Sequence, residues 1–262
     1  MEKQTACTQP PGPDTEEGIV RPVKRKSDPG VGPEAILVII PSDLDYLQEI
    51  TQARRSTTHD MGHFKLHRVE RERGKCFSIA GPFLGAPHAA MGMEKMIALG
   101  ASRIFVLGWC GSLQQRVRIG DFVIPTDALS EEGTSRHYPI GERPARTDMA
   151  LTVRLEDALR GSGGTTWRGP VWTTDAVYRE TPSKILQYQG MGVLAVDMET
   201  SALITLGVYR SVQVAGLLVV SDELSDLKWK PGFRSPVFRE ACRSAARVLL
   251  NIMDSQDIGP NI

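Results

Sequence analysis

The stretch that decides the fold is AILVII at residues 35–40, followed directly by PSD at residues 41–43. A short apolar run bounded by turn residues is typical of a parallel strand that is buried on both faces. The PSD segment then predicts a turn and the capped start of a helix that extends to about residue 53. The ordered part of the chain therefore opens with a strand followed by a helix.

The same alternation continues along the chain. Further strands are predicted at residues 62–69, 75–80, 104–108, 121–125, 171–178, 192–196 and 212–220. Further helices are predicted at residues 87–99, 147–159, 201–209 and 236–252. Strands that alternate with helices predict an α/β fold, a single three-layer domain in which helices flank a central, mostly parallel mixed β-sheet.

Residues 1–33 differ in composition from the rest of the chain. They hold six prolines and many charged residues, but few large apolar side chains. Such a segment buries too little apolar surface to offset the entropy lost on ordering. We therefore predict a disordered tail at residues 1–33 and one folded domain at residues 34–262.

The overall composition favours a small-molecule ligand. The 262 residues carry no formal net charge and 41% of them are hydrophobic, so a sizeable core can form. Nothing in this balance favours a nucleic-acid or membrane partner. Four cysteines without a C-x-x-C pair, and a polar N-terminus without an apolar signal core, indicate a cytoplasmic protein with reduced thiols.

Polar residues gather where the predicted strands end. They occur at residues 42–43, 108–112, 175–179, 197–199 and 221–222. In parallel α/β sheets, ligands bind beyond the carboxyl ends of the strands. The sequence therefore predicts a binding site at this edge of the sheet.

Two of these strand ends carry acids with two possible roles each. Glu199 can accept hydrogen bonds from the vicinal hydroxyls of a sugar beside an apolar wall at Met198, or it can be an ordinary acid in a first helical turn. Asp222, next to Ser221, can be a general acid with a raised pKa, or a turn residue. The turn at Gly108 can bring backbone N–H groups to an anion or can be only a tight turn.

The histidines and Cys110 do not indicate a metal site or a nucleophile. The five histidines show no metal-ligand spacing on a helix, so we expect no metal site. Cys110 has no base to pair with it, and a buried thiol is the simpler interpretation.

Four segments in this order resemble the nucleoside phosphorylase superfamily, which includes the hexameric-type purine nucleoside and uridine phosphorylases and the related nucleosidases. They are GWCGSL at residues 108–113, RIGDFVIP at 118–125, VDMETSA at 196–202 and VVSD at 219–222. The resemblance extends over roughly residues 35–254 and implies a nucleoside phosphorylase-like domain.

The resemblance implies a role for several residues. Glu199 looks like the ribose-binding glutamate, and Met198 like the ribose wall. Asp222 looks like the acid that purine-type members use at N7, so a purine nucleoside is favoured and uridine stays possible. The catalytic pair is thus Asp222 and Glu199. The implied base-binding residues are Tyr178, which matches a stacking aromatic, Ser221, Asp222 and Arg234.

The chain departs from the family at the phosphate site. At residues 41–46 it has PSDLDY where phosphorylases of this type have G-D-P-x-R, so that Ser42 replaces the glycine and Tyr46 the arginine. At the later strand end, Val106 replaces a second arginine and Trp109 a hydroxyl residue. The bidentate clamps that hold phosphate well are therefore missing.

Three interpretations follow from this departure. The site is rebuilt with Arg54, Arg55, Arg136 or His137, some lent by a neighbouring subunit, and the reaction is phosphorolysis to base and pentose 1-phosphate. Alternatively, the enzyme is a nucleosidase that uses water, or a non-catalytic nucleoside-binding member of the fold. The candidate phosphate or water region contains Ser42, Asp43, Gly108, Trp109 and Arg136. We expect phosphorolysis, with inorganic phosphate as co-substrate, no cofactor, and a homo-oligomer, either a dimer or a hexamer.

Overall fold

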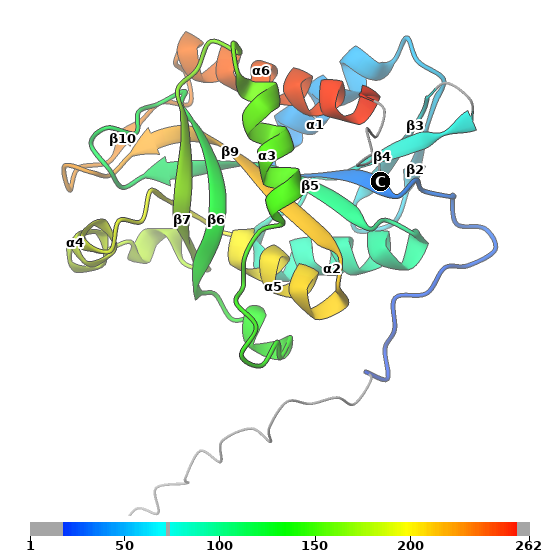
Figure 1. Cartoon of the computed structure of the whole chain (residues 1–262), viewed down its shortest axis with the longest axis horizontal. Coiled ribbons are helices and arrows are strands. Elements are labelled where there is room, and N and C mark those ends of the chain that lie inside the picture. The colour runs from blue at the N-terminus through cyan, green and yellow to red at the C-terminus, as the bar shows by residue number, and fades with distance from the viewer. Residues whose placement is uncertain (1–17, 72–73, 256–262) are drawn as a thin grey trace, which may run out of the picture.

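The computed structural model describes residues 18–71 and 74–255 and arranges them as one α/β domain (Figure 1). The strands are β1 (Glu34–Val38), β2 (Ser56–Asp60), β3 (Lys65–Glu70), β4 (Cys76–Gly81), β5 (Arg103–Ser112), β6 (Phe122–Glu131), β7 (Thr166–Thr174), β8 (Ala195–Asp197), β9 (Gln213–Glu223) and β10 (Lys230–Pro231). The α-helices are α1 (Pro41–Thr51), α2 (Gly85–Leu99), α3 (Met149–Leu159), α4 (Pro182–Gly190), α5 (Thr200–Arg210) and α6 (Pro236–Asp254), with short 3₁₀ helices η2 (Ser135–His137) and η3 (Val177–Arg179).

All ten strands belong to one mixed sheet, in the order β10-β9-β6-β7-β8-β5-β1-β4-β3-β2. Because β9 also pairs with β5, the strands β5, β9, β6, β7 and β8 close into a ring. The long ladders β5–β9 and β6–β7 are parallel, whereas β6–β9 and β5–β8 are antiparallel. The ring brings strands that are far apart in sequence to a common edge.

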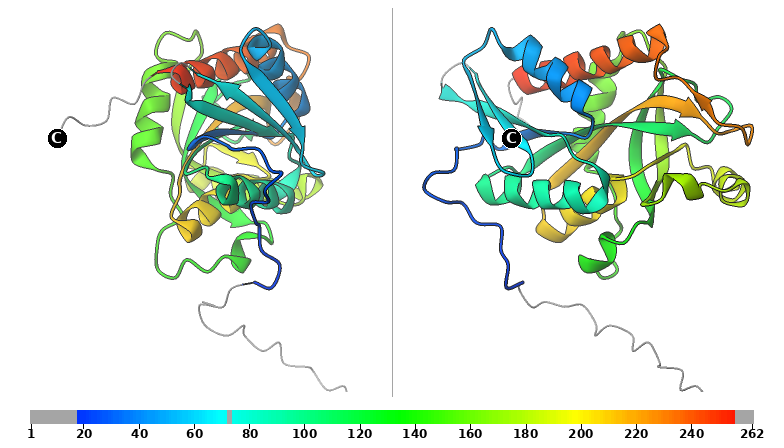
Figure 2. Two further views of the ribbon diagram at one scale, coloured as in Figure 1. Left: turned by 90° about the vertical axis from the view of Figure 1, so that its right-hand side faces the viewer. Right: turned by 180° about the vertical axis from the view of Figure 1, so that it is seen from behind.

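Helices cover both faces of the sheet (Figures 1 and 2). Helices α1, α3 and α6 pack on one face, over a core that includes Leu47, Leu155 and Phe238. Helices α2 and α5 pack on the other face, where Met93 and Leu203 are fully buried. The α/β class and the sheet flanked by helices are therefore confirmed.

The elements that the sequence did not predict bury little. Strand β2 (STTHD) has no buried residue, and in α4 just two of nine residues are buried, so neither carries a clear apolar period. The strand predicted at residues 171–178 ends at Thr174, and the chain turns into η3. Strands β5 and β6 extend several residues beyond the predicted apolar segments, and each continues its ladder past a register shift, at Cys110/Gly111 in β5 and between Pro125 and Ala128 in β6.

Residues 18–33 run past α2 without forming a helix or strand (Figure 2). The Lys95 ammonium donates hydrogen bonds to the Val23 carbonyl (2.7 Å) and the Asp28 carboxylate (2.6 Å). Residues 1–17 of the predicted tail lie outside the described residues. None of the helices in the described ranges has the length and apolar character that crossing a membrane requires.

Candidate active site

Gly111 of β5 joins the two strands that carry the predicted acids. It pairs with Val196 of β8 on one side and with Asp222 of β9 on the other. A Cβ atom at Gly111 would lie 3.0 Å from Asp222 Oδ2 and 3.4 Å from Val196 Cγ1. The missing side chain therefore lets the segment predicted to bind the sugar and the acid predicted to act on the base approach the same edge.

Asp197 anchors the segment of Met198 and Glu199 at the start of α5. Its Oδ1 accepts a hydrogen bond from the Thr173 hydroxyl (2.6 Å), and its Oδ2 accepts from the N–H groups of Thr200 (2.8 Å) and Glu199 (3.2 Å). The Thr173 oxygen in turn accepts from the Ser201 N–H at 3.0 Å. Burial raises the pKa of Asp197 although these donors oppose the shift.

Glu199 is held by a loop that is remote in sequence. Its Oε1 accepts a hydrogen bond of 2.7 Å from the Gly85 N–H at the start of α2, and just 5% of the residue is exposed. Burial, followed by the negative charge of Asp197, raises the pKa of Glu199 to about 8. Met198 between them is half-buried.

Asp222 lies one residue before the end of the long strand β9 and accepts hydrogen bonds from two side chains. Its carboxylate accepts from the Ser221 hydroxyl (2.6 Å) and the Trp229 indole N–H (3.0 Å). Burial raises the pKa of Asp222 against these two hydrogen bonds. Glu180, just after η3, is close enough to feel this charge: burial and then Asp222 raise the pKa of Glu180 to about 7. Glu180 can therefore carry a proton near neutral pH.

Asp43, in the first turn of α1, and Trp109, within β5, form a separate pair. The Trp109 indole N–H donates to Asp43 Oδ2 at 2.8 Å, in the first turn of α1. Asp43 is 5% exposed, and burial raises its pKa to about 6 against this hydrogen bond. The Trp109 ring meets Phe238 edge-on at 4.8 Å and lies 6.0 Å from Phe233. Next to Trp109, a Cβ atom at Gly108 would be tight against Ile39.

The other predicted site residues lie at the surface. Tyr178 is 97% exposed on η3, and Ser42, Arg136 and Arg234 are also exposed. Trp229 is the residue seen bonded to Asp222, and Arg234 is not seen in that contact within the described residues. The base-binding and phosphate roles of these four residues therefore stay predictions.

Arg54 and Arg55, proposed as replacement phosphate ligands, form ion pairs with acids of this chain. The Arg54 guanidinium makes two hydrogen bonds of 2.7 Å to Asp254, and Arg55 lies 3.4 Å from Glu70. Within residues 18–71 and 74–255, no group of three or more histidines, cysteines or acids is arranged to hold a metal ion.

Sequence reasoning missed four contributors to the site: Gly85, Thr173, Glu180 and Trp229. Gly85 and Thr173 lie far along the chain from the acids that they contact, Glu199 and Asp197. Glu180 and Trp229 lie outside the four segments that resemble the family. The glycine-rich segment GPFLGAP at residues 81–87 was the one local signal that something approaches this loop closely.

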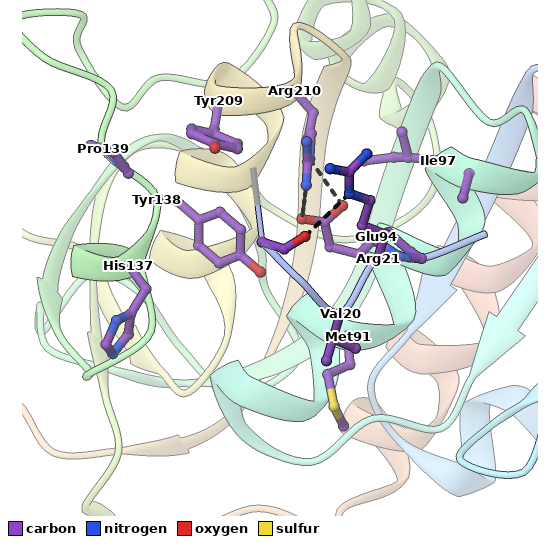
Figure 3. Close-up of a pocket in the computed structure, with 13 residues that line it drawn as sticks. Val20, Arg21, Met91, Glu94, Ile97, His137, Tyr138, Pro139, Tyr209 and Arg210 are labelled. Carbon is purple, nitrogen blue, oxygen red and sulfur yellow. Dashed lines mark hydrogen bonds and ion pairs between the residues drawn. The ribbon is translucent and has the colours of Figure 1, made fainter. Parts of the chain in front are cut away.

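A separate cavity of about 750 Å³ lies on the α2 and α5 side of the domain (Figure 3). At its centre Arg210 forms an ion pair with Glu94 at 2.8 Å, and Tyr138 and Tyr209 meet edge-on at 5.4 Å. His137, one of the proposed phosphate ligands, lines this cavity. None of its lining residues belongs to the strand edge that holds Glu199 and Asp222.

Comparison with known proteins agrees with this geometry. The model of the phosphorylase superfamily matches residues 35–254. A guanosine phosphorylase of Halorubrum lacusprofundi is 28% identical over 151 residues, which is 58% of this chain and 63% of the relative. A uridine phosphorylase of Salmonella typhimurium is 26% identical over 71% of this chain and 80% of the relative. A DeoD-type purine nucleoside phosphorylase of Bacillus cereus is 30% identical over 58% of this chain and 66% of the relative.

A solved uridine phosphorylase from Vibrio fischeri shares the fold, with a TM-score of 0.76 and 23% identity over 86% of this chain and 93% of that one. The chain belongs to the phosphorylase superfamily. The family, the fold class and the enzyme class that the sequence predicted are thereby confirmed.

Proposed function

We propose that the protein cleaves the N-glycosidic bond of a nucleoside, with a purine-type base preferred, by phosphorolysis to the base and a pentose 1-phosphate. The observation that carries this proposal is the junction at Gly111, which brings the segment of Glu199 and the acid Asp222 to one edge of the ring. The names of the relatives, which include guanosine, uridine and purine nucleoside phosphorylases, support the reaction type.

On the sugar side, Glu199 accepts hydrogen bonds from the vicinal hydroxyls and Met198 supports the apolar face of the ring. The backbone contact from Gly85 restrains the Glu199 carboxyl before the sugar arrives. Such restraint favours catalysis because the sugar is then held in the orientation that attack requires.

On the base side, Asp222 acts as the acid. As the C1′–N bond breaks, positive charge develops on the sugar and negative charge on the base. A proton from Asp222, whose pKa is raised by burial, neutralises the base as it leaves. Purine N7 can take such a proton. We therefore favour purines over uridine, and Glu180 is a second acid near the same position.

Phosphate is the proposed attacking group, and the reaction needs no cofactor. The second candidate is hydrolysis by water, and the contact between Trp109 and Asp43 favours it. Here a buried carboxylate in the first turn of α1 accepts from an indole within β5, and a carboxylate repels the phosphate dianion. Exposed Arg136, or arginines from another copy in a homo-oligomer, would be needed to offset that repulsion.

A nucleoside panel assayed with and without inorganic phosphate tests the proposal. We expect release of base that depends on phosphate, with a pentose 1-phosphate as the second product. Free pentose, formed equally without phosphate, would instead establish hydrolysis. No base release from any nucleoside under either condition would refute cleavage altogether.

A further inference from the structure

Asp197 and Glu199 are two buried carboxyls that lie two residues apart. They are 6% and 5% exposed, respectively. Within the described part of the chain, no lysine, arginine or histidine forms an ion pair with either of them. Two adjacent buried carboxylates without a cation repel each other, so the ionisation of one opposes the ionisation of the other.

The hydrogen-bond donors around the pair differ. The Thr173 hydroxyl donates to Asp197 Oδ1 at 2.6 Å, and a hydroxyl donor stabilises the charged form of a carboxyl group. Because the Thr173 oxygen accepts from the Ser201 N–H, its proton is directed at Asp197. Two backbone N–H groups at the start of α5 donate to the second oxygen of Asp197, where the helix dipole also favours an anion.

The groups around Glu199 stabilise a negative charge less than the groups around Asp197 do. Its carboxyl accepts from the Gly85 N–H, and the Met198 backbone adds a smaller effect in the same direction. No hydroxyl group among the described residues donates to it. With equal burial, the carboxyl that has more donors keeps the charge, and the other takes the proton.

We propose that Asp197 is a positioning residue that carries the negative charge of this pair, so that Glu199 stays protonated until the sugar of a nucleoside binds and displaces the proton. This inference rests on the proposed function, because the incoming sugar hydroxyls supply the donors that Glu199 lacks. As two hydroxyls donate to Glu199, its ionised form becomes favoured, and the proton on its oxygen leaves to solvent.

Proton release on binding makes the affinity for the nucleoside depend on pH in one direction. The pKa of Glu199, about 8 in the free protein, falls when the sugar binds, so affinity rises with pH until about pH 8 and is then level. Other titratable groups near the pair are Cys110 on β5, whose thiol pKa is raised by burial and then by Asp197 and Asp222, and Glu132, which accepts from the Ser201 hydroxyl at 2.9 Å. His88 of α2 bonds the Leu84 N–H beside Gly85, and Asp222 faces the site from β9.

Calorimetric titration of the full chain tests this inference. A purine ribonucleoside is titrated without phosphate, in buffers of equal pH but different ionisation enthalpy. We expect close to one proton released per nucleoside at pH 7, about half at pH 8, and almost none above pH 9. A 2′-deoxynucleoside, with one hydroxyl fewer, should release less.

The variant Asp197→Asn tests whether the charge of Asp197 keeps the proton on Glu199. Removing the charge lowers the pKa of Glu199, so proton release at pH 7 should fall by at least half. Glu94→Gln, which removes a buried acid far from the strand edge, is the matched control and should keep the full release. If Asp197→Asn does not fold, Thr173→Val, which removes one donor from Asp197, should lower the release in the same direction.

The outcomes are distinguishable. Binding without proton release, or full release in Asp197→Asn, would overturn the inference and leave the proposed function intact. A panel in which no nucleoside binds would overturn the proposed function and the inference with it.

Discussion

The proposed sugar side of the site, around Glu199, and the proposed attacking side, around Asp43, are built in different ways. Around Glu199, the family pattern is kept and a dense network of backbone and hydroxyl donors holds the segment. Around Asp43, the phosphate-binding arginines are missing, and one indole hydrogen bond within an aromatic cluster holds the acid. Under the proposed function, this difference means that recognition of the nucleoside and delivery of the attacking group can change separately within one fold.

The largest effect is expected from Asp222→Asn. The amide cannot donate a proton to the leaving base, so kcat/KM for purine nucleosides should fall about 100-fold. Steady-state kinetics with a nucleoside that carries an activated leaving group is the control, because that base needs little protonation. Equal losses for both substrates would argue against a proton donor.

Glu199→Gln tests the sugar side. An amide accepts hydrogen bonds from two hydroxyls more weakly than a carboxylate does, so kcat/KM should drop at least tenfold, about 1.4 kcal/mol. The measurement is initial rates with a ribonucleoside across a range of concentrations. Unchanged activity would show that the sugar assignment is wrong.

The pH dependence of stability should separate the two regions. Both carboxyls have a folded pKa above the unfolded value, so each stabilises the fold at low pH and loses that contribution as pH rises. The loss should extend to about pH 6 for Asp43 and to about pH 8 for Glu199.

Denaturant unfolding of the wild type, Asp43→Asn and Glu199→Gln at pH 5, 7 and 9 checks this. Between pH 7 and 9 the Glu199→Gln variant should gain about 1.4 kcal/mol relative to the wild type, whereas Asp43→Asn should gain almost nothing. Parallel curves for all three proteins would contradict the difference between the regions.

The smallest effect is expected from Trp109→Phe. The ring contact with Phe238 is largely kept while the donor to Asp43 is lost, so the free energy of unfolding should fall by about 1 kcal/mol. A double-mutant cycle with Asp43→Asn measures the contact itself. Additive losses would show that the pair contributes nothing beyond its separate residues.

Local pattern and motif carried much of the prediction. The apolar runs at residues 35–40 and 212–220 correspond to β1 and β9. A strand that is buried on both faces needs a continuous run of apolar residues, and such a run can be read directly from the local sequence. The segment at residues 196–202 was recognised as a family motif, and its place at the junction of β8 and α5 follows from the turn it encodes. The sequence did not predict β2 and α4 because these elements bury few residues and so show no clear apolar period.

By itself, the sequence determined the α/β class, the family and the two acids at the strand ends, since these depend on short segments with their own periodicity and order. Only the tertiary structure decided which groups surround those acids. Gly85 reaches Glu199 across 114 positions, and the ring places Asp222 against Gly111. Contacts of this kind depend on how distant elements pack, and the physical reason is that burial and donor geometry, which set each acid's pKa, exist only after the chain has closed around it.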